Sequence, residues 1–307
     1  MRRLTVRHVT SYRYSQPVRF GEHRMMFRPR ESHDLRLVST VLDIWPHPSE
    51  VRWVHDVFDN SVAIARFDQA ASELRFDSTV RLEHMETALP DYALEVGAQL
   101  YPFHYSDDER PDLASALTRQ FPCDDLTPWT SRFLMPSRST GTMALLQSMT
   151  RAIKEEFVYL ERREHGVQGP IETLRFRSGS CRDFAVFMME AVRSLGLAAR
   201  FVSGYIFAPD IDRAETVGGG ATHGWMQAYL PGAGWVDFDP TNCLVGNRNL
   251  IRVAVAWDQR NALPLWGTFY GSPSSFQGMD VDVSVTDETT ALGVGLWPTG
   301  RAPTVHK

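Results

Sequence analysis

Cys181 stands at the start of a segment that has the features of a helix. Ser180 is a good N-cap residue, and Asp183, three residues later, can return a hydrogen bond to it as in a capping box. Gly196 supplies the left-handed residue that commonly ends a helix. Between these signals the apolar side chains follow the spacing of an amphipathic face: Phe184, Phe187, Met188, Ala191 and Leu195.

The predicted position of Cys181 in the first helical turn would make its thiol acidic. The free N–H groups and the positive end of the helix dipole stabilise a nearby anion there. The thiolate is the nucleophilic form of cysteine, and the same N–H groups could hold an oxyanion that forms on an acyl carbon. A single cysteine in a helix is more often inert packing, so the nucleophile hypothesis requires a base elsewhere in the chain.

A candidate base and a candidate acid follow the helix on two strand-like runs. Residues 199–207, 222–230 and 235–239 are rich in β-branched and aromatic residues, and residues 231–234 form a strong turn between the last two runs. His223 lies at the start of the second run and Asp239 at the end of the third. Antiparallel pairing across the turn would therefore bring these two residues close together.

The register of this hairpin decides whether His223 and Asp239 share a face of the sheet. If Leu230 pairs directly with Trp235, the two side chains point to opposite sides. A one-residue bulge at the turn would set Trp225 opposite Asp239 and place both side chains on one face. We predict this shifted register because a Cys–His–Asp relay needs it. In such a relay the histidine moves the thiol proton, and the aspartate fixes the tautomer of the ring and stabilises its cation.

Three stretches around these residues resemble the core of the transglutaminase-like superfamily, in particular its bacterial cysteine peptidase-like members. They are residues 179–185, 222–225 and 234–242. The resemblance implies that Cys181 is the nucleophile, His223 the base and Asp239 the third member of a catalytic triad. It also implies a papain-like core, in which a Cys-bearing helix packs on an antiparallel sheet, and it extends to the N-terminal β-rich segment. The family completes its oxyanion hole with an aromatic or amide side chain upstream of the cysteine, and the candidates here are Tyr159, Gln168 and Trp129.

The remaining patterns predict an α+β protein that begins with an all-β, sandwich-like domain. Residues 4–14 alternate with a period of two, and further strand-like runs at 34–45, 51–58, 61–67 and 73–82 suggest an antiparallel sandwich or half-barrel over residues 1–85. The alternation places one set of side chains on a common face of the first strand: Leu4, Val6, His8, Thr10, Tyr12 and Tyr14.

The rest of the chain divides into four further parts. Residues 86–140 are rich in proline and predict a connecting segment that wraps the core, with a short helix near 113–121. Residues 141–260 form the predicted catalytic core, which opens with a helix from Thr142. Residues 261–290 predict strands that pair with the N-terminal domain or extend the core sheet, and residues 291–307 predict a loose tail.

Composition limits the class of protein and its partners. The 307 residues are 43% hydrophobic and 22% charged, and a net charge of -5 gives no electrostatic footprint for nucleic acid or a membrane surface. The chain has no run of 18 apolar residues and no signal-peptide pattern, so we expect a cytoplasmic protein. Three cysteines without a CxxC pair argue against disulfides and zinc, and Cys123 and Cys243 are expected to be inert. We expect no cofactor or metal, since the scattered histidines match no ligand spacing: His8, His23, His33, His47, His55 and His84.

These features predict a thiol-dependent enzyme of acyl transfer on amide bonds, with a peptide or protein as substrate. Hydrolysis of a peptide or isopeptide bond is the first expectation, because the sequence reveals no acceptor amine site and water needs none. Transamidation of glutamine side chains is the second, and transfer from a thioester donor, as in arylamine acetyltransferases, is the third. The alternative class is a non-catalytic scaffold, which the presence of all three triad residues disfavours. The N-terminal segment would dock substrate along a sheet edge or, as we prefer, brace the core.

Overall fold

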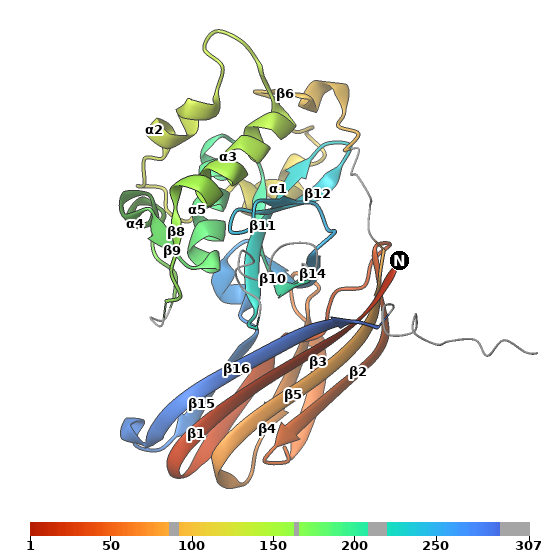
Figure 1. Cartoon of the computed structure of the whole chain (residues 1–307), viewed down its shortest axis with the longest axis vertical. Coiled ribbons are helices and arrows are strands. Elements are labelled where there is room, and N and C mark those ends of the chain that lie inside the picture. The colour runs from red at the N-terminus through yellow and green to blue at the C-terminus, as the bar shows by residue number, and fades with distance from the viewer. Residues whose placement is uncertain (86–91, 163–165, 208–219, 289–307) are drawn as a thin grey trace, which may run out of the picture.

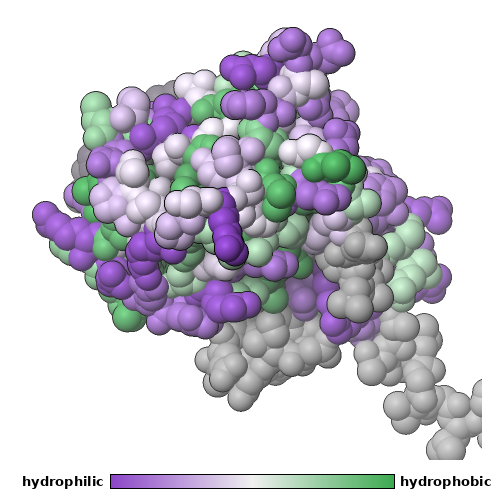
Figure 2. Space-filling view, turned by 90° about the horizontal axis from the view of Figure 1, so that it is seen from above, coloured by the Kyte–Doolittle hydropathy of each residue, from purple (hydrophilic) through white to green (hydrophobic). Residues whose placement is uncertain are grey.

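The computed structural model describes residues 1–85, 92–162, 166–207 and 220–288. The long strands of one sheet form one end of the molecule, and the helices gather around a smaller sheet at the other end (Figure 1). Figure 2 looks down on the end that carries the helices, where hydrophilic and hydrophobic residues are interspersed. The molecule therefore has the all-β N-terminal part and the α+β core that the sequence predicts.

The larger sheet is organised around one strand of 24 residues, β1 (Arg2–Met25). The first half of β1 pairs with β5 (Ala70–His84) and β16 (Phe276–Asp287), whereas its last residues pair with β4 (Ser61–Arg66) and β15 (Leu265–Tyr270). Register shifts along β1 allow it to bend from one layer to the next. The outer strands of the seven-stranded sheet are β2 (Leu35–Trp45) beside β5 and β3 (Glu50–His55) beside β4.

Side chains from the two layers of this sheet enclose a common core. Phe20 and Met25 of the second half of β1 cluster with Leu74 and Phe76 of β5. Alternate residues of the first half point inward as predicted, and all of them are buried except the half-buried Tyr12. The structure thus confirms the sandwich-like β domain, with β1 belonging to both layers.

The smaller sheet has five antiparallel strands in the order β13-β12-β11-β10-β14. The predicted strands that follow the core helix are all present, and the predicted C-terminal strands divide between the two sheets. The strand at residues 250–257 joins the core sheet beside β10, whereas β15 and β16 return to β1. The strands of this sheet are β10 (Ala199–Ile206), β11 (His223–Leu230), β12 (Gly234–Asp239), β13 (Leu244–Val245) and β14 (Leu250–Ala256).

The predicted helices are present, and two of them, the helix from Thr142 and the Cys-bearing helix, pack on one face of this sheet. The helix predicted from Thr142 is α3 (Thr142–Glu156), and the Cys-bearing helix is α5 (Cys181–Ser194). Apolar residues of α5 share a buried cluster with Met226 of β11 and Phe238 of β12. The other helices are α1 (Arg110–Leu117), which ends four residues before the predicted limit, α2 (Thr127–Thr130) and α4 (Pro170–Phe176). Short 3-10 turns lie at Val96–Ala98, Ser131–Phe133, Gln259–Ala262 and Pro273–Ser275, and two-residue strands are β6 (Leu100–Tyr101), β7 (Thr140–Gly141), β8 (Val158–Tyr159) and β9 (Ser178–Gly179).

The amphipathic pattern predicted for α5 is incomplete, because this helix is buried on nearly all sides. Glu190 and Arg193 are both buried and form an ion pair of 2.9 Å. The backbone N–H groups of Gln120 and Phe121 donate to the Glu190 carboxylate at 3.0–3.2 Å. The connecting segment therefore covers the side of α5 that the sequence pattern leaves to solvent. The predicted tail at residues 291–307 lies outside the described residues.

Candidate active site

The start of α5 is held by the capping box that the sequence predicts. Asp183 Oδ2 accepts hydrogen bonds from the backbone N–H of Ser180 at 2.8 Å and from its hydroxyl at 2.9 Å. Asp183 Oδ1 accepts from the backbone N–H of Gln168 at 2.7 Å and from the Arg162 guanidinium at 2.8 Å. One fully buried carboxylate thus fixes both the first turn of the helix and the loop before it, which places Cys181 in a defined position.

The β11–β12 hairpin has the register that puts His223 and Asp239 on one face. Leu230 pairs with Gly234, and the same register continues to Met226 and Phe238, so Trp225 lies opposite Asp239 as predicted. The predicted bulge is not the cause, because this pairing continues without a register shift. A three-residue loop, in which Gly232 has a positive φ of 88°, sets the register instead.

His223 and Asp239 are in direct contact. His223 Nε2 lies 2.8 Å from Asp239 Oδ2, and both side chains are fully buried. Asp239 also accepts from the backbone N–H of Thr241 at 2.9 Å and from the side chain of Asn242 at 2.9 Å. Burial alone would raise the pKa of Asp239, but the charge of His223 and these hydrogen bonds hold it below its usual value. The carboxylate is therefore an ionised and fixed acceptor for the histidine ring.

The Cys181 thiol interacts with the same ring. Burial opposes ionisation of this thiol, but hydrogen bonding to His223, the charge of His223, the Arg182 charge and the N–H of Gly224 together lower its pKa. The pKa of His223 is raised, because Asp239 and Cys181 stabilise the imidazolium more than burial destabilises it. A thiolate–imidazolium pair is the state that these shifts favour.

The free nitrogen of the His223 ring is the one available for the sulfur. Nε2 is occupied by Asp239, and Nδ1 has no partner in hydrogen-bond geometry among the described residues. Nδ1 is therefore the ring nitrogen left to exchange a proton with the Cys181 sulfur, and nucleophile–base contacts often tighten only when substrate binds.

Of the three candidates for the oxyanion donor, Tyr159 is placed at the site. Its strand β8 runs parallel to β9, which pairs Tyr159 with Gly179, two residues before the cysteine. Burial, followed by the Cys181 charge, raises the pKa of Tyr159 to about 12, so its phenol remains a neutral donor at neutral pH.

The other two candidates for the oxyanion donor, Gln168 and Trp129, stabilise the fold instead. The Gln168 amide donates to the Ser178 carbonyl at 2.9 Å and to the Thr173 hydroxyl at 3.1 Å, which holds the loop before α5. Trp129 packs against Phe187 with ring centroids 4.7 Å apart, inside the hydrophobic core.

Sequence reasoning missed Trp225 as a neighbour of the histidine. The indole lies nearly parallel to the imidazole, with ring centroids 5.9 Å apart and an angle of 24° between the planes. Trp225 is fully buried, and its N–H donates to Asp237 at 2.7 Å. Alternation along β11 was the available signal, because residues 223 and 225 of one strand share a face.

The remaining cysteines and histidines lie elsewhere. Cys123 and Cys243 are exposed residues, but the Cys243 sulfur is partly shielded from solvent, and this partial burial raises its pKa. His8 is buried between the Tyr205 hydroxyl and the Thr10 hydroxyl, each 3.0 Å from a ring nitrogen. No group of three or more potential metal ligands is found among the described residues.

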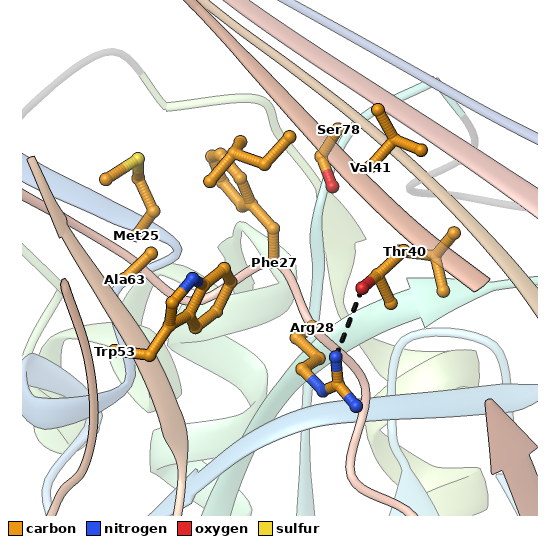
Figure 3. Close-up of a pocket in the computed structure, with 10 residues that line it drawn as sticks. Met25, Phe27, Arg28, Thr40, Val41, Trp53, Ala63 and Ser78 are labelled. Atoms are coloured by element: carbon orange, nitrogen blue, oxygen red, sulfur yellow. Dashed lines mark hydrogen bonds between the residues drawn. The ribbon is translucent and has the colours of Figure 1, made fainter. Parts of the chain in front are cut away.

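A hollow in the N-terminal domain is separate from this site (Figure 3). Met25, Phe27 and Trp53 contribute apolar surface to it, and the Arg28 guanidinium donates to the Thr40 hydroxyl at 3.1 Å. All of its lining residues precede the core in the chain. Among the described helices, none is long and apolar enough to span a membrane.

Comparison with known proteins finds a family model that matches each of the two parts of the chain. Residues 136–240 match the model of the transglutaminase-like superfamily, and residues 4–83 match the bacterial transglutaminase-like N-terminal region. The Mycobacterium tuberculosis protein Rv2569c is 28% identical over 294 residues, which cover 92% of each chain. The Mycobacterium leprae protein ML0607 is 34% identical over 117 residues, 38% of this chain and 40% of that protein.

A solved structure has the same fold. It is a protein from Cytophaga hutchinsonii described as a candidate cysteine protease. The match covers 100% of this chain and 94% of the Cytophaga chain, with a TM-score of 0.65 and 17% sequence identity. The predicted resemblance and fold class are confirmed by these matches.

Proposed function

Because residues 136–240 match the model of the transglutaminase-like superfamily, we propose that the chain is a thiol-dependent acyl-transfer enzyme that hydrolyses peptide or isopeptide bonds. The observation that carries this proposal is the convergence of three residues from distant parts of the chain. Cys181 opens α5, His223 opens β11, and Asp239 ends β12, yet the histidine contacts the aspartate at 2.8 Å and shifts the pKa of the thiol. The roles proposed are nucleophile for Cys181, base and acid for His223, and orienting acid for Asp239.

The first half of the reaction forms a thioester. The Cys181 thiolate attacks the carbonyl carbon of the amide, and the π electrons of the carbonyl move onto its oxygen. The backbone N–H groups at the start of α5 and the Tyr159 phenol would donate to this oxyanion. The C–N bond then breaks as the imidazolium N–H of His223 gives its proton to the departing amine, which leaves a thioester on Cys181.

The second half returns the enzyme to its starting state. His223, now neutral, takes a proton from water as the water oxygen attacks the thioester carbon. The C–S bond breaks, the acid product leaves, and the thiolate–imidazolium pair is restored. An amine in place of water would give transamidation with the same residues, so the acceptor and not the triad separates these two activities.

Product analysis tests the proposal and its first alternative. Purified protein is incubated with an unstructured protein substrate, with and without an added primary amine, and the new amine termini and released ammonia are measured. Hydrolysis predicts new termini or ammonia without added amine, and none from the Cys181→Ala protein. Strict dependence on the added amine would contradict hydrolysis and favour transamidation. Equal products from Cys181→Ala and the unchanged protein would contradict thiol catalysis.

A further inference from the structure

We propose that Asp34 of the N-terminal domain positions the histidine of the core through a chain of buried polar contacts. The chain runs from Asp34 to Arg252, from Arg252 to Asp237, from Asp237 to Trp225, and from the Trp225 ring to the ring of His223. The inference rests on the proposed function, and it gives the N-terminal domain a part in the reaction. Asp34, Arg252, Asp237 and Trp225 are positioning residues in this account.

The three hydrogen-bonded links of the chain are short, and the last link is a ring contact with centroids 5.9 Å apart. Arg252 donates to both Asp34 oxygens at 2.6 and 2.7 Å through one nitrogen, and to Asp237 Oδ2 at 3.0 Å through another. The other oxygen of Asp237 accepts from the Trp225 indole N–H at 2.7 Å. An indole held at its N–H cannot turn in its plane, so the face that it offers to the imidazole is fixed.

The strand pattern explains why this chain reaches the site. Residues 237 and 239 of β12 point to the same side as residues 223 and 225 of β11, whereas Met226 and Phe238 point toward α5. The side of the hairpin that carries the His223–Asp239 pair therefore also carries, next to it, the Trp225–Asp237 pair. Both carboxylates are nearly inaccessible to solvent, at 0% for Asp239 and 2% for Asp237.

Asp34 is anchored on the N-terminal side of the domain junction. Its backbone carbonyl accepts from the N–H of Met85, just after the end of β5. The Asn247 amide donates to its carboxylate at 2.6 Å, and Ser32 also contacts it. Arg252, with its side chain 16% exposed, is thus clamped between an acid of each domain.

The kinds of contact at the domain junction indicate that the series from Asp34 orients His223 and does not only hold the two domains together. A buried ion pair adds little net stability over an apolar contact of the same shape, because both charges lose their hydration. The junction has other contacts that could hold the domains together, such as Asn60 with the backbone of Val255 and Tyr205 with His8. The chain from Asp34 is the contact that ends at the ring stacked on His223.

The test compares variants along the chain with a control at the same junction. The full-length Asp34→Asn, Trp225→Phe and Tyr205→Phe proteins are made, and the rate of alkylation of Cys181 by iodoacetamide is followed from pH 5 to 9. Tyr205→Phe removes a junction hydrogen bond that does not lead to the histidine. Thermal unfolding of each protein reports how far the junction is weakened.

We expect Asp34→Asn and Trp225→Phe to slow alkylation of Cys181 near neutral pH by about tenfold, because a displaced base no longer stabilises the thiolate. For the same reason, the pH at which the alkylation rate falls off on the acid side should move to a higher value. Tyr205→Phe should lower the melting temperature and leave the alkylation profile unchanged. Asp34→Glu, which keeps the charge, should restore part of the rate. In the double variant Asp34→Asn with Trp225→Phe, the alkylation rate should fall by less than the product of the two single-variant fold-reductions, since both substitutions interrupt the same series of contacts.

The inference is overturned if Asp34→Asn and Tyr205→Phe share the profile of the unchanged protein and differ from it only in melting temperature. Such a result, with Cys181 still selectively reactive, would leave the proposed function intact. If the unchanged protein alkylates Cys123, Cys181 and Cys243 equally, the proposed function fails, and the inference fails with it.

Discussion

The groups around Cys181, and not the residue type alone, determine whether its thiol is protonated or ionised. Burial would keep the thiol neutral, but an imidazole, a guanidinium and a backbone N–H act in the opposite direction. The imidazole can do this because Asp239 holds its far nitrogen at 2.8 Å. The reactivity of the thiol therefore depends on the whole line of three groups.

Changes at His223 and Asp239 should reduce activity to different extents. We expect His223→Ala to lower kcat/KM by about 10⁴-fold and Asp239→Asn by about 10²-fold, the two ends of the range for a positioned base. The smaller loss follows because Thr241, Asn242 and Trp225 still hold the surroundings of the ring. Initial rates with the substrate found by product analysis would measure both, and a greater loss in Asp239→Asn would contradict the assigned roles.

Removal of the thiol should affect catalysis far more than folding. The Cys181 side chain lies in the first turn of α5 at the surface end of the core, and it is 7% exposed. We expect Cys181→Ala to be inactive and to melt within a few degrees of the unchanged protein. A cooperative transition displaced much further would indicate that the residue has a structural role.

The positions of the three site residues were predictable from the sequence, and their supporting residues were not. A helix cap before Cys181 and a turn between His223 and Asp239 are local signals, and both are present in the structure. Trp225 and Asn242 contact the histidine and the aspartate through the tertiary fold, which local spacing does not specify. Their catalytic consequence, like that of the three residues, is a prediction for experiment.

At the scale of the element, α5 has to hold its first turn rigid while it is buried on almost every side. Asp183 provides this rigidity, since it accepts from Ser180, Gln168 and Arg162 together. The sequence predicts the cap of the helix but not its complete burial. The reason is that residues 120 and 121, which lie 70 and 69 positions before Glu190, supply the cover.

The cap can be tested with two substitutions in the same helix. We expect Asp183→Ala to reduce the free energy of unfolding by about 3–5 kcal/mol, because it removes a buried carboxylate that pairs with Arg162 and accepts from the backbone N–H groups of Ser180 and Gln168. It should also slow alkylation of Cys181. Ser194→Ala removes only a hydroxyl contact to the Ala191 carbonyl in the last turn, and it should cost about 1 kcal/mol or less. Urea unfolding would measure both, and similar losses would refute the special role of the cap.

At the scale of the molecule, the chain crosses between the two sheets more than once. It leaves the N-terminal sheet for the core, completes the core sheet with β14, and returns to β1 as β15 and β16. The sequence predicts each of these strands, but it leaves their partners open. Pairing between strands more than 200 residues apart depends on complementary surfaces that no local pattern reveals.

This crossing predicts that the core does not fold as an independent unit. A fragment of residues 136–240, the part that matches the superfamily core, lacks β14, so β10 loses one neighbour and exposes an edge. We expect this fragment to aggregate or to melt without a cooperative transition, whereas the full chain should unfold in one step. Circular dichroism during heating would decide, and a cooperative fragment with the melting temperature of the full chain would contradict the prediction.

The most direct measurement of the central claim is the pH dependence of alkylation at each cysteine of the unchanged protein. The lowered pKa of Cys181 keeps its thiolate as the pH falls below the ordinary thiol value of about 8.5, until the pH passes through that lowered pKa. The raised pKa of Cys243 delays its reaction to higher pH. Peptide mass spectrometry after brief treatment with iodoacetamide at pH 6 should therefore find Cys181 modified and Cys243 unmodified. Equal modification of the cysteines, rising together only above pH 8, would contradict a thiolate held by His223 and Asp239.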